Sequence, residues 1–578
     1  MSGCQRISYA GCLSDTFRRL RPELIRWTAK LGAPYGSSLE WWMSSLAGKN
    51  VLATPIFLHI CYLDVLSQIT REWPGGALLI VCEDEYLLAA MKRLLRAAGH
   101  STTRTAGWPV HLALYTFSEV ARIAYRWIKA IGMLVAQFAA ARLTRHRRRR
   151  AGPRDAGKEA LIHTCIDDTC FGPNGEFRDR YFCGLADWLR GRGYHVTMLP
   201  WVYNTRRNVF ENFRWFRSSR DSFLLVEDYL RATDLFRCGW KLARCGRILK
   251  GKQRFGLHDV SPLVHRERRI SASPSLLLRF LLYGPALERW IAEGHECTVF
   301  IDMFENSAPE RPQIASLRKC SPATLLIGYQ HGAASLSEFL PYAIDPDEWR
   351  HGIFPDRIVC SGEFTANILV RGGFPQDHVV AGPALRYRHL VDRSRASLSS
   401  SAACAAPRRQ ALVMLSLELS GALELLHRLL AIRELLAQCS LEVVLRAHPM
   451  TDRGILLRAC GLNGLPAAWT WGDAPLAEQL ARAAVVISTG TNAQVDAAAS
   501  GIPVVCVKRE LGFDYNFLDY WSDTYPVCRP IAPQDLAPRL SQILEDREGN
   551  MRAQVERLAA EIVEGLGKLD DAHFSAFI

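Results

Sequence analysis

Short apolar runs that end in polar residues recur along the last third of the chain. They cover residues 411–415, 441–445, 485–488 and 504–507. Runs of this length between turn signals are typical of buried strands. Segments with helical periodicity separate them, at residues 421–438, 476–483 and 493–500. This alternation predicts a parallel sheet with helices on both faces.

The same alternation, with more interruptions, occurs earlier in the chain. Strands are expected at residues 77–81, 160–165, 196–199, 297–301, 324–329 and 357–360. Helices are expected at residues 85–98 and 181–190, and residues 204–290 are expected to be predominantly helical. The pattern predicts an α/β fold with two doubly wound lobes that face each other. In such sheets ligands bind outside the carboxyl ends of the strands, which places the site in a cleft between the lobes.

A stretch of small and polar residues without lasting periodicity, residues 391–410, is the clearest linker. It separates an N-terminal lobe, residues 1–390, from a C-terminal lobe, residues 411–578. A helical and basic insertion is expected near residues 104–155. The length of 578 residues agrees with two or three domains.

The net charge of +13 is concentrated locally, because seven arginines lie within the 13 residues from Arg142 to Arg154. A single cluster indicates a local anionic partner and does not favour nucleic acid. Apolar residues precede it at helical spacing, namely Trp127, Ile128, Ile131, Leu134, Val135 and Phe138. Residues Trp127 to Arg150 are therefore a candidate for contact with an anionic membrane surface. The alternative is a helix packed on the core and followed by a solvated basic loop.

The cysteines favour a reduced compartment. There are 17 of them, an odd number, and none forms a CxxC motif. No apolar signal segment is seen at the start, so a cytoplasmic location is expected, with peripheral contact at the inner face of the cytoplasmic membrane as its extension. Motifs for zinc, dinucleotides and P-loop chemistry are missing, and no metal site or cofactor is predicted.

Two strand ends of the C-terminal lobe carry residues suited to a nucleotide. Hydroxyls and backbone N–H groups at the start of the helix expected at residues 493–500 suit a phosphate. His448 precedes Pro449, which restricts its backbone and the direction of its ring. The candidate nucleotide-binding residues are Arg446, His448, Pro449, Ser488, Thr489, Gly490, Thr491, Asn492 and Asp496.

Acidic residues and one histidine follow the strands expected in the N-terminal lobe. A carboxylate at such a strand end is placed to take a proton from a hydroxyl or to attack a carbon. For each acid, helix capping or turn formation is the structural alternative. The catalytic candidates are Glu305, Asp302, His331, Asp168 and Asp179.

The order of these motifs resembles that of bacterial surface-carbohydrate glycosyltransferases of the GT-B type. The motifs are Phe304-Glu305-Asn306, Gly328-Tyr-Gln-His331-Gly332, Arg446-x-His448-Pro449 and Ser488-Thr-Gly-Thr491. The likeness extends to proteins of O-antigen and capsule loci related to transferases for 3-deoxy-manno-octulosonic acid (Kdo) and sialic-type nonulosonic acids.

The resemblance implies two Rossmann-like lobes and a metal-independent transfer of Kdo or a nonulosonic acid. The donor would be a CMP-linked sugar, held by His448, Pro449, Ser488, Thr489 and Thr491. The acceptor would be a hydroxyl of a glycan or lipid-linked glycan. Two other GT-B activities, sugar-nucleotide epimerase and polyol-phosphate transferase, remain alternatives. A non-catalytic assembly protein that binds a nucleotide or a membrane is the alternative from another class.

Overall fold

The structure is a computed structural model. It describes residues 9–73, 75–103, 108–145, 158–172, 175–203, 205–273, 277–332, 339–397, 410–439, 441–449, 451–546 and 548–578. Most of the predicted arginine cluster, Arg147 to Arg150 and Arg154, lies outside these residues.

A seven-stranded parallel sheet is the centre of the N-terminal lobe, with the strand order β3-β2-β1-β6-β7-β8-β9. The strands are β1 (Glu159–Ile166), β2 (His195–Val202), β3 (Ser222–Phe223), β6 (Cys297–Met303), β7 (Leu325–Gln330), β8 (Arg357–Cys360) and β9 (Val379–Ala381). All eight residues of β1 are buried, as expected for a parallel strand covered on both faces. The chain builds outward from β1 in one direction and then, from β6, in the other.

A five-stranded parallel sheet is the centre of the C-terminal lobe, with the order β12-β11-β10-β13-β14. The strands are β10 (Gln410–Met414), β11 (Glu442–Arg446), β12 (Trp469–Trp471), β13 (Ala483–Ser488) and β14 (Val504–Cys506). Alternate residues of β10 enter separate cores on the two faces of the sheet. The predicted α/β class with two doubly wound lobes is therefore confirmed, and this arrangement is that of the GT-B fold.

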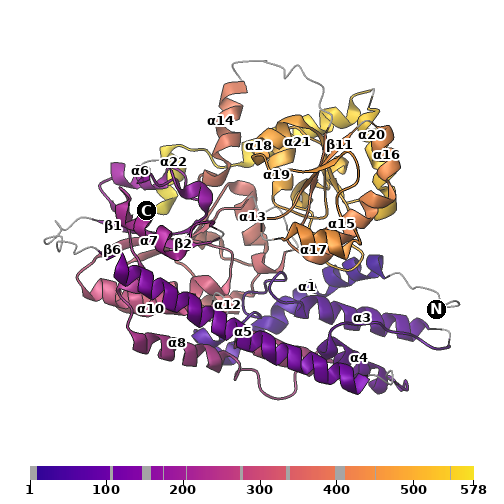
Figure 1. Cartoon of the computed structure of the whole chain (residues 1–578), viewed down its shortest axis with the longest axis horizontal. Helices are drawn as coiled ribbons and strands as arrows, with labels where there is room; N and C mark the ends of the chain where they lie inside the picture. Colours follow the sequence, from indigo (N-terminus) through magenta and orange to yellow (C-terminus); the bar gives the residue numbers. More distant parts are fainter. Residues whose placement is uncertain are drawn as a thin grey trace.

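Helices cover both faces of the C-terminal sheet (Figure 1). One face carries α14 (Arg388–Ser397), α18 (Leu476–Arg482), α19 (Ala493–Ala499) and α21 (Asn550–Gly565). The other carries α15 (Leu419–Ala431), α16 (Arg433–Gln438), α17 (Arg453–Ala459) and α20 (Leu536–Leu544). The single helix expected at residues 421–438 is thus two helices that meet at Ile432.

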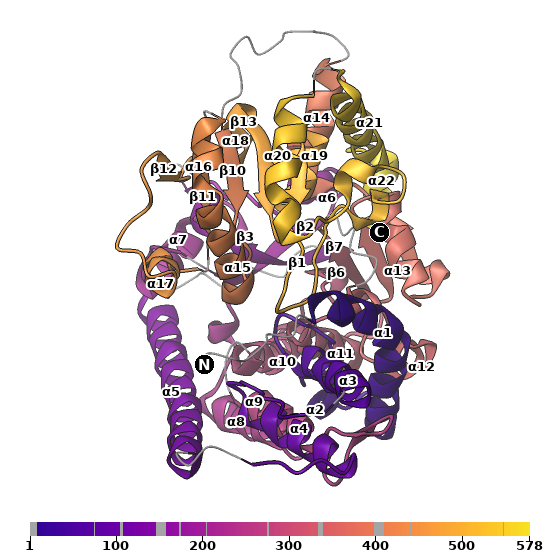
Figure 2. The ribbon, with the colours of Figure 1, turned by 90° about the vertical axis from the view of Figure 1, so that its right-hand side faces the viewer.

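A helical module lies below the N-terminal sheet and also contacts the C-terminal lobe (Figures 1 and 2). Its core is continuous with one face of the sheet. The helices on this side are α1 (Ala10–Gly32), α2 (Leu39–Trp42), α3 (Ile56–Glu72), α4 (Glu85–Ala97), α8 (Ala232–Cys245), α9 (Ser261–Ser271), α10 (Leu277–Ala292), α11 (Arg311–Cys320), α12 (Pro346–His351) and α13 (Glu363–Arg371). A two-stranded hairpin, β4 (Arg254–Phe255) and β5 (His258–Asp259), lies between α8 and α9.

The opposite face of the N-terminal sheet is covered by α6 (Leu185–Gly191), α7 (Val209–Ser218) and the end of the long helix α5 (Trp108–Leu143). The strand expected at residues 77–81 does not form, and this segment has no regular structure. Leu79 is 62% exposed and Val81 is 84% exposed, whereas Leu78 and Ile80 pack on the core of the helical module. The helix expected after it is confirmed as α4.

The chain crosses between the lobes twice, and the two crossings touch. At the first crossing Ala384 and Tyr387 already belong to a core of the C-terminal lobe, so the change of lobe precedes the linker expected at residues 391–410. α14 occupies the start of that linker. At the second crossing Gly567 accepts a hydrogen bond from the N–H of Ala384, at 3.0 Å. A side chain on Gly567 would meet the carbonyl oxygen of Gly382, which explains the glycine.

The end of the chain returns to the N-terminal lobe, although residues 411–578 were expected to form one unit. α22 (Asp571–Phe574) brings Phe574 and Phe577 into the core beside α6. The rings of Trp188 and Phe574 stack at 5.5 Å. Arg357, at the start of β8, donates to the carbonyl oxygen of Ala576 at 2.9 Å. The C-terminal segment therefore fastens the two lobes together.

Replacement of Phe577 by alanine should destabilise the N-terminal lobe, because this ring is fully buried against Tyr329. Truncation of a buried phenylalanine costs about 3 kcal/mol or more. Urea unfolding followed by tryptophan fluorescence measures the loss. Lys568→Ala, at an exposed position of the same segment, should change stability by no more than about 0.5 kcal/mol. Equal stability of the two variants would contradict the role given to the C-terminal segment.

Candidate functional site

The topological switch point of the N-terminal sheet lies between β1 and β6. The chain leaves these neighbouring strands in opposite directions, which opens a crevice at their carboxyl ends. Glu305 follows β6 at this point, and His331 follows the adjacent strand β7. The side chain of Glu305 is 58% exposed, whereas that of His331 is 8% exposed. The carboxylate is thus accessible in the crevice, and the imidazole is held behind it.

Glu305, His331 and Arg386 form a chain of contacts. Oε1 of Glu305 lies 3.4 Å from Nε2 of His331. Nη1 of Arg386 lies 3.4 Å from Nδ1 of the same ring. A guanidinium only donates hydrogen bonds, so Nδ1 must accept and Nε2 must carry the proton that points to Glu305. The geometry therefore indicates a neutral imidazole that donates to the carboxylate.

The electrostatics agree with this protonation pattern. Burial lowers the pKa of His331, and the charge of Arg386 lowers it further, while Glu305 acts in the opposite direction. Burial alone would raise the pKa of Glu305, but the contact with His331 and the charge of Arg386 outweigh it and hold this pKa below its usual value. Near neutral pH the pair is therefore a carboxylate beside an uncharged histidine.

Tyr181 packs against the ring of His331. Its ring lies edge-on to the imidazole at 4.9 Å, and the guanidinium of Arg386 lies 5.9 Å from its centre. Asp179 fixes the backbone here, since its carboxylate accepts from the N–H groups of Tyr181 and Phe182 at 2.8 and 2.9 Å. Burial raises the pKa of Asp179 to about 6. The structure thus gives Asp179 a positioning role.

Two other predicted acids have hydrogen-bond partners of their own. Asp302 is 4% exposed, and its Oδ1 lies 2.7 Å from Nδ1 of His163 between the sheet and the helical module. Asp168 is exposed in the short 3-10 helix that follows β1, and it accepts from the N–H of Arg206 at 3.0 Å. Glu305 and Asp168 are therefore exposed at the switch point, and Glu305 is the one in contact with His331.

The switch point of the C-terminal sheet lies between β10 and β13, where residues 488–492 form the predicted turn. Ser488 and Thr489 are almost completely buried. The N–H of Gly490 donates to Oγ of Ser488 at 2.9 Å. Gly490 has a φ of +140°, and a side chain there would meet the carbonyl oxygen of Tyr515 at 2.5 Å. This combination requires glycine.

The helix after this turn, α19, begins at the expected residue but has only seven residues. The N–H of Gln494 donates to the carbonyl oxygen of Thr491, and that of Val495 donates to Asn492, at 3.0 and 3.1 Å. Two N–H groups of the first turn are therefore already used. Phosphate binding by residues 488–492 stays a prediction.

The two switch points lie against each other. A side chain on Gly332, next to His331, would come within 3.3 Å of Nδ2 of Asn492. The hydroxyl of Tyr387, in the first crossing, donates to Oδ1 of Asn492 at 3.4 Å. Asp496 of α19 lies 3.4 Å from Nε2 of His389 at the same junction. His331 and Asn492, predicted separately in the two lobes, thus lie near each other at one junction, where the topology places the interlobe cleft.

Arginines from both lobes face this cleft. Burial lowers the pKa of Arg446, and the charge of Arg180 in the opposite lobe lowers it further. Arg446 donates to Oε1 of Gln479 at 2.6 Å and to the carbonyl oxygen of Ala474 at 2.8 Å, which orients its guanidinium. Arg180 also forms an ion pair with Asp167, at 3.0 Å. A site with this charge suits an anionic ligand.

His448 and Pro449 follow β11 beside Arg446. His448 is half-buried, and Pro449 is exposed. Burial lowers the pKa of His448, so its imidazole is predominantly neutral at pH 7. Among the described residues, three or more His, Cys, Asp or Glu side chains nowhere gather in the way metal ligands do. Metal independence stays a prediction.

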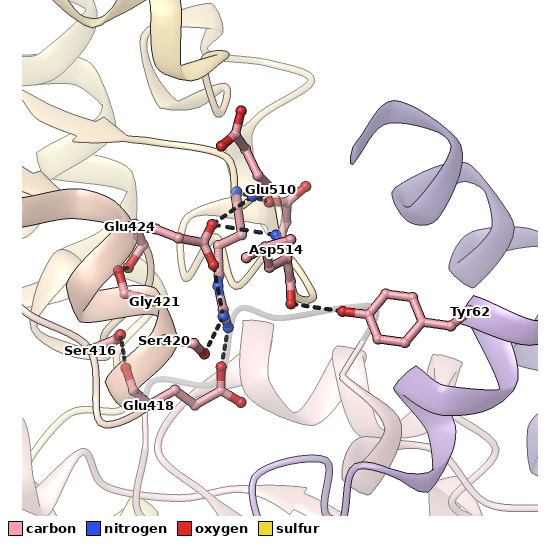
Figure 3. A network of polar contacts seen from close by, with 11 residues as sticks. Tyr62, Ser416, Glu418, Ser420, Gly421, Glu424, Glu510 and Asp514 are labelled. Carbon is pink, nitrogen blue, oxygen red and sulfur yellow. Dashed lines mark hydrogen bonds and ion pairs between the residues drawn. The ribbon is translucent and has the colours of Figure 1, made fainter. Parts of the chain in front are cut away.

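A second polar network joins the C-terminal lobe to the helical module (Figure 3). Buried Arg509 binds Glu418 in the loop after β10 and Ser420 and Glu424 of α15. From the module, Tyr62 donates to the carbonyl oxygen of Leu511 at 3.0 Å. The loop that follows β14 thus links the C-terminal switch point to α3.

Sequence reasoning missed Arg386, Tyr181 and Arg180. Arg386 follows β9, a strand of three residues that the apolar pattern did not predict. Arg180 and Tyr181 occur in the segment that was assigned to acids and to the start of a helix, whereas α6 begins at Leu185. The sequence does contain one signal for these residues. An arginine stands directly before a tyrosine in both Arg180-Tyr181 and Arg386-Tyr387.

Comparisons with known proteins identify no family. Neither the protein-family models nor the curated proteins include a match. Solved structures that resemble the chain include a putative UDP-N-acetylglucosamine 2-epimerase from Listeria monocytogenes, with 10% identity, a TM-score of 0.41 and coverage of 73% of this chain and 94% of that chain. The glycosyltransferase SnogD from Streptomyces nogalater has 15% identity, a TM-score of 0.37 and coverage of 71% and 96%.

MurG from Acinetobacter baumannii is a further similar structure, with 10% identity, a TM-score of 0.35 and coverage of 72% of this chain and 98% of that chain. At this level the similarity carries no argument about activity. The fold assignment rests on the strand orders and the two facing sheets.

The contacts of His331 predict opposite effects of two substitutions on its pKa. Arg386→Gln removes a positive neighbour and should raise the pKa, whereas Glu305→Gln removes a negative one and should lower it. NMR titration of selectively labelled histidine measures both shifts. Arg388→Gln, two residues along the chain and exposed, is the control and should leave the pKa unchanged. A lowered pKa in Arg386→Gln would contradict the geometry.

Proposed function

We propose that this chain is a glycosyltransferase that moves a sugar from a nucleotide-activated donor to a hydroxyl of a glycan or lipid-linked glycan. The proposed donor is Kdo or a sialic-type nonulosonic acid linked to CMP. The transfer needs no metal ion and no cofactor besides the donor. The observation that carries the proposal is the accessible carboxylate of Glu305 at one switch point, in contact with His331, whose neighbour Gly332 lies against Asn492 of the polar turn at the other.

Glu305 has the properties of a general base. Its pKa is held below the usual value, so it is ionised at neutral pH and ready to accept a proton from an acceptor hydroxyl. The proton on Nε2 of His331 fixes the orientation of the carboxylate. In a double displacement the same carboxylate would attack the sugar carbon, and the anomeric configuration of the product distinguishes the two routes.

The arginines of the cleft suit the charge of the donor. When the bond between sugar and phosphate breaks, negative charge develops on the departing nucleotide. Arg386, Arg446 and Arg180 provide positive charge from both sides of the cleft. The proposed donor sugars also carry a carboxylate of their own, which a guanidinium binds well. Neutral His448 and the turn at residues 488–492 would contact the nucleotide in the C-terminal lobe.

Glu305→Gln should reduce kcat by about 10²-fold to 10⁴-fold, because the amide keeps the shape and loses the base. Nucleotide affinity should change little. Sugar transfer from a CMP-linked donor to a glycan acceptor measures kcat, and isothermal titration measures binding. Glu176→Gln, an acid with 54% of its side chain exposed in a neighbouring loop, is the matched control.

Retained transfer in Glu305→Gln would remove this residue from the mechanism. Turnover of the nucleotide sugar without any acceptor would favour an epimerase instead. Surface-glycan synthesis that survives both Glu305→Gln and His448→Ala would favour a non-catalytic assembly protein.

CMP should raise the thermal unfolding temperature of the wild-type protein, since a ligand that binds the native state alone stabilises it. The rise should exceed that with UDP, GDP or dTDP and should persist in EDTA. Arg446→Gln should reduce it, whereas Arg433→Gln, on α16 away from the cleft, should not. Stabilisation by UDP and not by CMP would overturn the proposed donor.

A further inference from the structure

One face of α5 presents apolar side chains to solvent along most of the helix. Nine of the large hydrophobic side chains of α5 have half or more of their surface exposed, which is unusual for a helix surface, and six of the nine share one side. These six are Val110, Leu114, Phe117, Ile128, Ile131 and Val135. Their spacing of three, four and eleven residues keeps them on one side of a helix, over about 38 Å. We call these six residues the α5 stripe.

The opposite face of α5 is anchored in the protein. Leu134 and Ala140 are buried, and Trp127 lies so close to Gly239 of α8 that a Cβ atom on that glycine would be 3.8 Å from its ring. The helix also packs against α7. The apolar residues that the sequence placed together therefore divide: Trp127, Leu134 and Phe138 pack inward, and Ile128, Ile131 and Val135 belong to the stripe.

The charge beside the stripe is positive. Between Trp108 and Leu143 the chain has four lysines and arginines and one acidic residue, Glu119. Glu119 is covered and forms an ion pair with Arg122. Exposed Lys129 lies two turns beyond Arg122 along the same edge, since seven residues are close to two turns. A long apolar stripe with a basic edge is the pattern of a helix that lies in the interface of an anionic bilayer.

We infer that the α5 stripe is a docking surface for an anionic lipid bilayer, with α5 lying parallel to the membrane plane. None of the helices in the described part of the chain is both long and apolar enough to cross a membrane. Figures 1 and 2 show α5 at the periphery of the N-terminal lobe, with α8 beside it. On α8, Phe236 is 80% exposed and Trp240 is 58% exposed, which adds aromatic side chains near the same helix.

A second copy of this chain fits the stripe less well. Pairing two α5 helices along the stripe would bring the basic residues Arg122 and Lys129 of one copy near those of the other. Like charges at such positions destabilise helix pairing. The one acid of α5 is already engaged with Arg122. An anionic surface, in contrast, pairs with every basic residue along the edge.

Flotation of the full-length protein with vesicles tests the inference. The vesicles contain equal parts of phosphatidylglycerol and phosphatidylcholine, or phosphatidylcholine alone. Wild-type protein should float with the anionic vesicles and lose binding as salt is added. The triple variant Phe117→Ser, Ile128→Ser, Val135→Ser should bind about tenfold more weakly or not at all. Arg122→Gln with Lys129→Gln should reduce binding to anionic vesicles selectively.

The control is Ile455→Ser, which removes an exposed isoleucine from α17 in the other lobe and should bind as wild type does. Circular dichroism and an unchanged unfolding temperature establish that the variants fold. Wild-type protein that ignores anionic vesicles, or a triple variant that binds them fully, would overturn the inference. A wild-type dimer that the triple variant converts to monomers, with vesicle binding retained, would assign the stripe to a second copy instead. Because vesicle binding is measured without substrate, this result is independent of the proposed transfer.

Discussion

His331 contacts Arg386 through Nδ1 and Glu305 through Nε2, and both contacts require the imidazole proton to be on Nε2. Arg386 donates to Nδ1, so Nε2 keeps its proton and points it at Glu305. Each residue comes from a different element: the end of β6, the end of β7, and the crossing between the lobes. The neutral ring therefore couples the orientation of the carboxylate to the position of the crossing segment. The side chains of Arg386 and Glu305 therefore each supply one of the two contacts that fix this proton.

The strands could be predicted well because parallel strands buried on both faces are nearly continuous apolar runs. β8 was expected at the residues it occupies, and β6 within two residues of its end. β3, β9 and β12 have two or three residues and were missed, since such runs carry no periodic signal. The strand expected at residues 77–81 has a clear apolar run but does not form. A buried strand needs a covering surface on both faces, and none covers Leu79 or Val81.

The site could be predicted in part. Strand-end position found Glu305 and His331, because ligands gather at the carboxyl edge of a parallel sheet. The same rule also selected Asp302, whose partner His163 comes from the adjacent strand and draws it into the sheet. The direction in which a side chain points from the sheet depends on the pleat of its strand and on the neighbouring strands. The sequence of a single strand does not reveal either. Contacts between remote segments, such as Trp188 with Phe574, were likewise beyond a local pattern.

Arg180 and Arg446, one from each lobe, repel each other where the lobes meet. Burial and, after it, the charge of Arg180 from the opposite lobe lower the pKa of Arg446. Bringing the two guanidinium groups together therefore costs Coulomb energy, and contacts between the lobes, such as that of Tyr62 with Leu511, oppose that cost. An anion between the arginines reverses the sign of this interaction. Since a ligand shifts an equilibrium by its differential affinity for the two states, an anionic ligand favours the arrangement in which both lobes contact it.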